Sequence, residues 1–334
     1  MKYKGLHSRV LHASAVMLAW ACAMPVLAHH SRAEFDSDDV ALLRGMVTRY
    51  VWANPHAFLY VETVDDAGVR TGWEVITDAL PILSRSGWTR DSFAVGDPVT
   101  VQALPNRNPD KKHVLLVSVE KADGSVLVPR EEDRPAHSAR ATSLAGVWEL
   151  PDGGEDTGDF SRRWAQVALT EKALAAKAEF TPEDRPAAQC IAPPTPMLMA
   201  MPYLNEIEIR DDTVVLRSEF FDVERIVYMD GRGNPENGER TIQGHSIGWW
   251  DGEALVVDTT GFADHRAPIR GPNEGVPSGA MRHVRETYRL NEDRTGLTID
   301  FTVEDLEYLG EPFSGTLEWV YSPQLTFMGF ECAP

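Results

Sequence analysis

The stretch LTIDFTVE, residues 297–304, alternates strictly between apolar and polar side chains. Successive side chains of a β-strand point to opposite faces of a sheet, so its four apolar residues share one face and its four polar residues the other. This pattern is typical of an antiparallel sheet that buries one face and exposes the other to water. We therefore predict an antiparallel β domain in this part of the chain.

The rest of the second half has the same β character. Its β-rich segments are separated by turn signals such as Asp230-Gly231 and Asp251-Gly252. Many short strands divided in this way indicate a closed barrel or a sandwich, and we expect one helix at 170–179. The expected strands are 144–150, 206–210, 213–220, 223–229, 254–260, 281–290, 296–304, 314–321 and 324–331.

The first half predicts a smaller barrel. Three β-rich segments, a short helix at 79–87 and two more β-rich segments follow one another, which is the order of a five-stranded OB-type barrel. The expected strands are 42–52, 57–64, 69–77, 98–104 and 113–120.

Charged, proline-bearing sequence without apolar periodicity separates the two halves at 129–143, and this composition is typical of a linker. We expect an OB-like domain at 29–124, a linker at 125–143 and the larger antiparallel barrel at 144–334.

The first 28 residues have the features of a secretory signal peptide. Three basic residues open the segment, and residues 13–28 are apolar and uncharged. That run is shorter than the about 20 residues that a membrane-spanning helix needs. Val26-Leu27-Ala28 provides small residues at the recognition positions for cleavage. We expect cleavage after Ala28 and a periplasmic protein without a membrane span.

Charge and cysteine content narrow the possible partners. The chain has 51 acidic and 32 basic residues, a formal net charge of −19. An acidic surface repels phosphate backbones and anionic lipid, so we expect no nucleic-acid or membrane partner. Cleavage of the leader leaves Cys190 and Cys332. An oxidising compartment favours a disulfide between them, and two buried free thiols are the alternative.

Three segments of the first half carry a family resemblance: AHHSRAEFD (28–36), VWANPH (51–56) and SGWTRDSFAVGDPVTV (86–101). Together they resemble an uncharacterised family of exported bacterial proteins, the domain of unknown function 6152.

In the second half, GHSIGWWDGEALVVDTTGF (244–262), CIAPPTPMLM (190–199) and the C-terminal cysteine resemble another uncharacterised exported group. Gly146-Val147-Trp148 is similar to the Gly-x-Trp opening of lipocalin-type barrels, which implies a lipocalin-like barrel. Neither resemblance implies a known reaction.

Two histidines follow the expected cleavage site. After cleavage His29 would carry a free α-amino group that can chelate a metal ion together with its imidazole ring. A further imidazole from His30 or His56 would complete a nitrogen-rich site, which suits Cu(II). The alternative is a polar leader without metal, because chain termini are commonly poorly ordered. Copper binding by these three residues is a hypothesis.

Three residues of the second half are candidates for proton transfer. His245 lies between glycines in GHSIG, where we expect a tight turn, and imidazole titrates near neutral pH. Asp258 ends the apolar run ALVVD, and Glu286 shares a strand face with Val284 and Tyr288. With these groups the protein would be a hydrolase, lyase or isomerase. A structural role is the alternative for each of them.

Arg225 is flanked on its strand face by Val223 and Val227, so we expect it to point into the barrel. A buried carboxylate must be paired or have its pKa raised. We therefore predict an inward Arg225–Glu286 ion pair, with Arg225 also a candidate to hold an anionic group. The aromatic candidates for a ligand cavity are Trp148, Trp249, Trp250, Tyr288 and Trp319.

The chain has no glycine-rich phosphate loop, CxxC, HExxH or EF-hand pattern, which argues against nucleotide, zinc-protease and calcium-loop functions. The leading hypothesis is a periplasmic protein that binds a small organic ligand in its second barrel. The alternatives are the enzyme described above and a protein-interaction module in an envelope complex.

Overall fold

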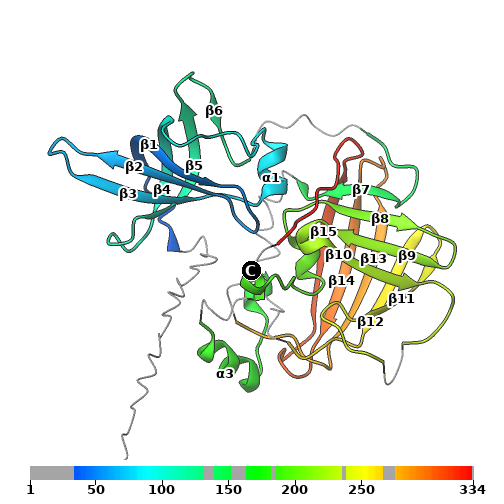
Figure 1. Cartoon of the computed structure of the whole chain (residues 1–334). Helices are drawn as coiled ribbons and strands as arrows, with labels where there is room; N and C mark the ends of the chain where they lie inside the picture. Colours follow the sequence, from blue (N-terminus) through cyan, green and yellow to red (C-terminus); the bar gives the residue numbers. More distant parts are fainter. Residues whose placement is uncertain are drawn as a thin grey trace, which may run out of the picture.

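The computed structural model describes residues 34–130, 139–151, 163–181, 186–234, 238–265 and 275–332. The chain is mostly β and forms two barrels, an N-terminal one of five strands and a C-terminal one of nine (Figure 1). Both halves thus have the predicted architecture. Within these described residues, every helix is too short or too polar to cross a bilayer.

The N-terminal barrel has the predicted OB-like order. Its neighbours follow β3-β2-β1-β4-β5, and a parallel pairing of β3 with β5 closes it. A two-residue strand, β6, extends this sheet beside β5 within the segment expected to be linker. The elements are β1 (Ala41–Val51), β2 (Phe58–Val64), β3 (Arg70–Ile76), α1 (Leu80–Arg85), β4 (Pro98–Pro105), β5 (His113–Lys121) and β6 (Val126–Leu127).

Nine strands close the C-terminal barrel in the order β10-β11-β12-β13-β14-β15-β7-β8-β9. Neighbours are antiparallel except β10 and β11, which run parallel and so are not joined as a hairpin. The strands are β7 (Gly146–Glu149), β8 (Asn205–Ile209), β9 (Thr213–Ser218), β10 (Val223–Tyr228), β11 (His245–Asp251), β12 (Ala254–Thr260), β13 (His283–Leu290), β14 (Gly296–Glu304) and β15 (Phe313–Tyr321).

Short helices connect these strands. A helical turn at 163–166 and the predicted helix lie between β7 and β8, followed by two 3-10 turns. They are α3 (Glu171–Glu179), η4 (Pro186–Gln189) and η5 (Met197–Ala200), while η6 (Phe220–Asp222) joins β9 to β10. The LTIDFTVE stretch lies in β14, and its four apolar side chains are buried in the core as their alternation predicts.

Two strand assignments from the sequence are wrong. Residues 245–251 form β11 instead of a tight turn, because they pair continuously with β12 from His245 to Asp251. Residues 324–331 do not form a strand. The backbone N–H groups of Met328 and Phe330 donate to the carboxylates of Glu219 and Asp222, which replaces strand pairing.

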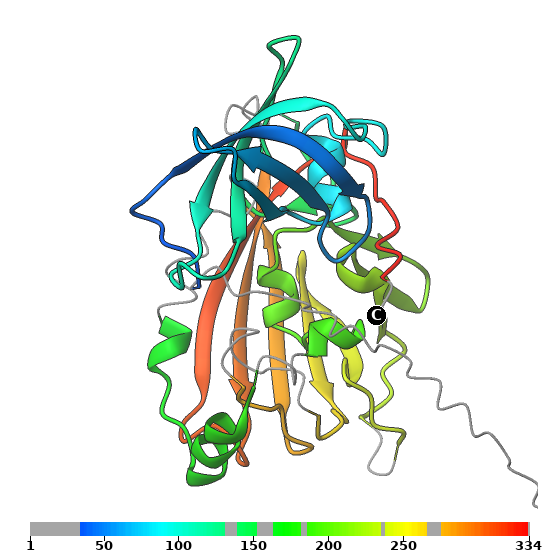
Figure 2. The ribbon, with the colours of Figure 1, turned by 60° about the vertical axis from the view of Figure 1, so that its left-hand side comes forward.

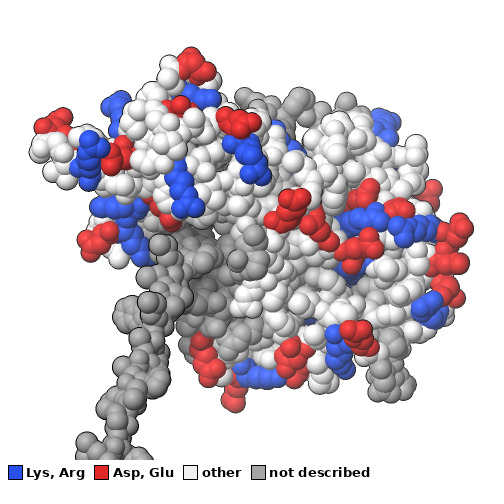
Figure 3. All heavy atoms as spheres, viewed as in Figure 1, with Lys and Arg blue, Asp and Glu red and all other residues white. Residues whose placement is uncertain are grey.

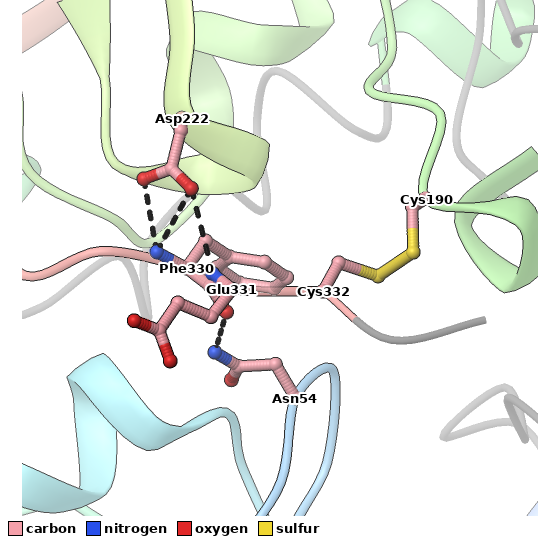
Figure 4. Close-up of a disulfide and its surroundings, with 6 residues drawn as sticks. All are labelled: Asn54, Cys190, Asp222, Phe330, Glu331 and Cys332. Atoms are coloured by element: carbon pink, nitrogen blue, oxygen red, sulfur yellow. Dashed lines mark hydrogen bonds between the residues drawn. A yellow bond between two sulfur atoms is a disulfide. The ribbon is translucent and has the colours of Figure 1, made fainter.

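The C-terminal tail, residues 322–332, lies where the two barrels meet. Phe330 is fully buried in an apolar cluster that joins Ile82 of α1 to Tyr203 and Phe220 of the second barrel. Figure 4 shows Asn54 of the first barrel donating to the carbonyl of Phe330. Beside this contact Cys332 forms a disulfide with Cys190, with Cα atoms 5.8 Å apart, which confirms the predicted pairing.

Glu219 is a second junction between the barrels, and its side chain is fully buried. Arg85 of α1 donates to both carboxylate oxygens at 2.9 and 2.8 Å. The backbone N–H groups of Leu204 and Met328 donate to the same carboxylate at 3.4 and 3.0 Å. One carboxylate therefore joins the first barrel, the tail and the chain that precedes β8.

Charged side chains of both signs are interspersed on the face shown in Figure 3, with no continuous basic patch there. Arg217 of β9, for example, contacts Glu206, Glu208 and Glu224 on neighbouring strands at 2.8, 2.7 and 2.9 Å. Ion pairs exposed to solvent contribute little to stability. The charged groups with large energetic consequences are therefore those inside the barrels.

Candidate functional site

The polar centre of the C-terminal barrel is an ion pair between Arg225 and Glu286. Alternation along β10 and β13 points both side chains inward, where they are 5% and 0% exposed. Arg225 donates from Nη1 to Oε1 and from Nη2 to Oε2 of Glu286 at 3.1 and 2.7 Å. The predicted inward pair is confirmed.

Hydroxyl groups complete this network. Arg225 Nη2 also donates to Thr259 Oγ1 at 3.3 Å and to Ser246 Oγ at 3.5 Å. Tyr288 donates to Glu286 at 3.5 Å. Burial, together with the nearby Glu286 carboxylate, raises the pKa of Tyr288 well above its ordinary value, so its hydroxyl remains a donor. Apart from Nε of Arg225, which has no hydrogen-bond partner among the described residues, the buried charges are therefore surrounded by polar partners.

A segment from outside the sheet enters the barrel beside this ion pair. Residues 190–204, which we call the plug segment, run from Cys190 through η5 to the start of β8. The short helical turns that precede β8, green in Figure 2, lie against the barrel strands. Tyr288 OH contacts Met199 Sδ at 3.1 Å, and Trp319 Nε1 donates to Met199 O at 3.1 Å. The interior, where lipocalin-type barrels hold a ligand, thus contains part of the chain itself.

Thr195 links the plug segment to the buried charges. Its hydroxyl donates to Glu286 Oε1 at 2.5 Å. We expect Thr195→Val, which keeps the shape and removes this donor, to lower the free energy of unfolding by about 1.5–3 kcal/mol, the value of a hydrogen bond to a charged group. Thermal and urea unfolding measure this loss. Thr298→Val on the outer face of β14 is the control and should change little; equal effects at both positions would contradict the prediction.

Arg282 is the site residue that sequence reasoning missed. It is 1% exposed, and its Nη2 donates to the carbonyl of Thr195. Its Nε and Nη1 have no hydrogen-bond partner among the described residues. The signal was present: the alternation that places Glu286 and Val284 inward continues to Arg282, two residues before Val284.

The structure does not bring the three candidates for proton transfer together. His245 lies on β11 and stacks on Tyr228 with ring centroids 5.0 Å apart, and burial lowers its pKa. Asp258 and its neighbour Thr259 point to opposite faces of β12. Thr259 points inward to Arg225, whereas Asp258 lies on the other face and accepts a hydrogen bond from His283 Nε2 at 2.9 Å. Only Glu286 belongs to the interior network.

Of the aromatic candidates, Trp148, Tyr288 and Trp319 are buried in the core of the C-terminal barrel. Trp249 and Trp250 are 39% and 44% exposed. The guanidinium carbon of Arg285 lies 5.2 Å from the ring centroid of Trp249. The first three therefore line the interior and the last two lie at the surface.

His29 and His30 lie outside the described residues. His56 Nδ1 donates to Thr77 O at 2.8 Å. Among the residues that the structure describes, no three His, Cys, Asp or Glu side chains are grouped so that they could hold a metal ion. Copper binding by the histidines of the N-terminus stays a prediction.

The comparisons with known proteins concern the first half of the chain. Residues 17–115 match the model of a family of unknown function, DUF6152, which agrees with the resemblance of the N-terminal segments. The match spans β1 to β4 and ends in β5. No curated protein matches the chain. The resemblance of the second half to an exported family stays a prediction.

Proposed function

We propose that the C-terminal barrel binds a small organic ligand in its interior, between the plug segment and β13. The observation that carries this proposal is the buried guanidinium of Arg282, whose Nε and Nη1 lack acceptors. Trp148, Met199, Tyr288 and Trp319 belong to the same buried core. An apolar and aromatic interior with a few placed polar groups is the usual composition of a small-molecule site.

The plug segment would cover this ligand. It is fixed at one end by the Cys190–Cys332 disulfide and at the other by the N–H of Leu204, which donates to Glu219. Between these ends Pro193 O accepts from Gln243 Nε2 at 3.0 Å, and Thr195 contacts Glu286. Entry and release of a ligand would require the part around Thr195 to move while both ends stay anchored.

Binding has more support than catalysis. A general acid and a general base must reach the same substrate. Asp258 points to the outer face of β12, away from Thr259 and the interior, and the Glu286 carboxylate is already bound by Arg225 and Thr195. We place this activity in the periplasm, because a disulfide is typical of an oxidising compartment.

Methionine-methyl NMR tests the binding site directly. The probes are benzoate, benzamide, hexanoate and hexanamide, added to the full chain labelled with 13C-methyl methionine and assigned with Met199→Leu. We expect at least one probe to shift the Met199 signal saturably with 1:1 stoichiometry. Met46, an exposed methionine of β1, is the internal control and should not move. No shift with any probe, or equal shifts at both methionines, would overturn the proposal.

A further inference from the structure

We infer that the ligand of the C-terminal barrel carries a carboxylate, and that Arg282 binds it through two parallel N–H groups. This inference rests on the proposed function and names the chemical class of its ligand. Arg282 lies immediately before β13, and its buried guanidinium contacts the plug segment and Phe262.

The bond to Thr195 leaves Arg282 with the donor geometry that a carboxylate needs. A guanidinium has five N–H groups in a planar fork. One Nη2 hydrogen is parallel to the Nε hydrogen, and the other is parallel to a hydrogen on Nη1. Thr195 O accepts from Nη2, while Nε and Nη1 have no acceptor among the described residues. Whichever Nη2 hydrogen faces Thr195, one complete pair of parallel donors therefore remains, and such a pair matches one carboxylate.

Among the residues that the structure describes, no carboxylate fills this position. Glu286 is bound by Arg225, Thr195 and Tyr288. Asp305 accepts the backbone N–H groups of Gly279, Glu307 and Tyr308 instead of forming an ion pair with Arg282. Burial lowers the pKa of Arg282 to about 9, although Asp305 and Glu286 raise it through space, so the guanidinium still carries its charge at neutral pH.

The two buried arginines of this barrel provide an internal comparison. Arg225 has carboxylate and hydroxyl partners on both terminal nitrogens and lacks a partner among the described residues only at Nε. Arg282 has one carbonyl. A buried charge without a counter-ion lowers the stability of the folded protein. A functional site can retain such a cost, and here a bound ligand would compensate for the stability that Arg282 loses.

The surroundings favour an organic acid over an inorganic anion. The guanidinium carbon of Arg282 lies 5.1 Å from the ring centroid of Phe262, which belongs to the same buried core as Met197, Met199 and Val284. An apolar body beside the carboxylate would be buried against these side chains, and that burial contributes to affinity. Phosphate or sulfate has no apolar body to bury and carries more charge than one guanidinium fork neutralises.

Calorimetric titration of the full chain compares benzoate with its neutral isostere benzamide and with inorganic phosphate. We expect benzoate to bind at least tenfold more tightly than benzamide and phosphate to show no comparable binding. Arg282→Met should weaken benzoate binding about 10- to 100-fold and leave benzamide almost unchanged. Arg282→Lys should give an intermediate loss, because it keeps the charge without the fork. Arg289→Met, on the outer face of the same strand, is the control and should bind like the wild type.

A second readout is independent of any ligand. Arg282→Met removes a buried charge that has no counter-ion among the described residues, so the ligand-free variant should fold and melt a few degrees higher than the wild type. Equal binding of benzamide and benzoate would overturn the carboxylate inference and leave the proposed function standing. So would tighter binding of phosphate, or unchanged benzoate binding by Arg282→Met. If none of the probes binds, the proposed function itself fails.

Discussion

Replacing Glu286 by glutamine is expected to lower the free energy of unfolding by about 3–5 kcal/mol, because Arg225 would keep a buried charge without a counter-ion. Arg225 is 5% exposed, and its terminal nitrogens both donate to the Glu286 carboxylate. A neutral amide keeps the shape but provides one acceptor where the carboxylate has two. Domains are commonly stable by only 5–15 kcal/mol, so a loss of this size should show as a much lower urea midpoint for the C-terminal barrel.

A double variant separates the charge from the packing. Replacing both partners by apolar residues of similar volume, Arg225→Met with Glu286→Leu, removes the two buried charges together and should recover most of the stability lost by Glu286→Gln. The exposed pair of Arg289 and Asp300, 2.5 Å apart, is the matched control, and Asp300→Asn should barely change stability. The explanation fails if the double variant is less stable than Glu286→Gln, or if Asp300→Asn costs as much.

The fold was predictable wherever local alternation determines which face of a strand is buried. The two-residue alternation of strand side chains alone predicts that the apolar residues of β14 and the charged pair on β10 and β13 point inward. β11 was missed because glycines at 244 and 248 suggest a turn, whereas Gly248 is needed for close packing: a Cβ there would lie 2.6 Å from a methyl of Val227. Strand pairing over a distance in sequence decided that segment, and a local pattern does not contain it.

The site was predictable in part for the same reason. The two-residue alternation of strand side chains placed Arg225 and Glu286 inside the barrel. The same alternation, continued for two residues before Val284, would have placed Arg282 there too. The plug segment was not predictable, because prolines and methionines in CIAPPTPMLM carry no information about which surface they contact. Its contacts with Glu286 and Arg282 span 91 and 87 positions in sequence. Asp258 was ambiguous because apolar residues precede it on both faces of its strand.

The disulfide has the other large expected effect. Cys190 and Cys332 are 142 positions apart, and the chain-entropy model assigns closure of such a loop about 5 kcal/mol, less any strain. The double variant Cys190→Ser/Cys332→Ser should therefore unfold at clearly lower urea concentration than the oxidised wild type. Wild-type protein treated with reductant is the matched control, and it should lose a similar amount.

The loss should be concentrated where the bond acts, at the tail and the plug segment. Cys332 lies next to the contacts of Phe330 with Asn54 and Asp222, so releasing it loosens the junction of the two barrels as well as the start of the plug segment (Figure 4). Hydrogen exchange should rise first at Phe330 and Leu204, whose N–H groups are held by Asp222 and Glu219, while the strand amides of β1–β5 stay protected. If the double variant keeps the wild-type urea midpoint, or if exchange rises equally in β1–β5, the bond does not hold these elements together.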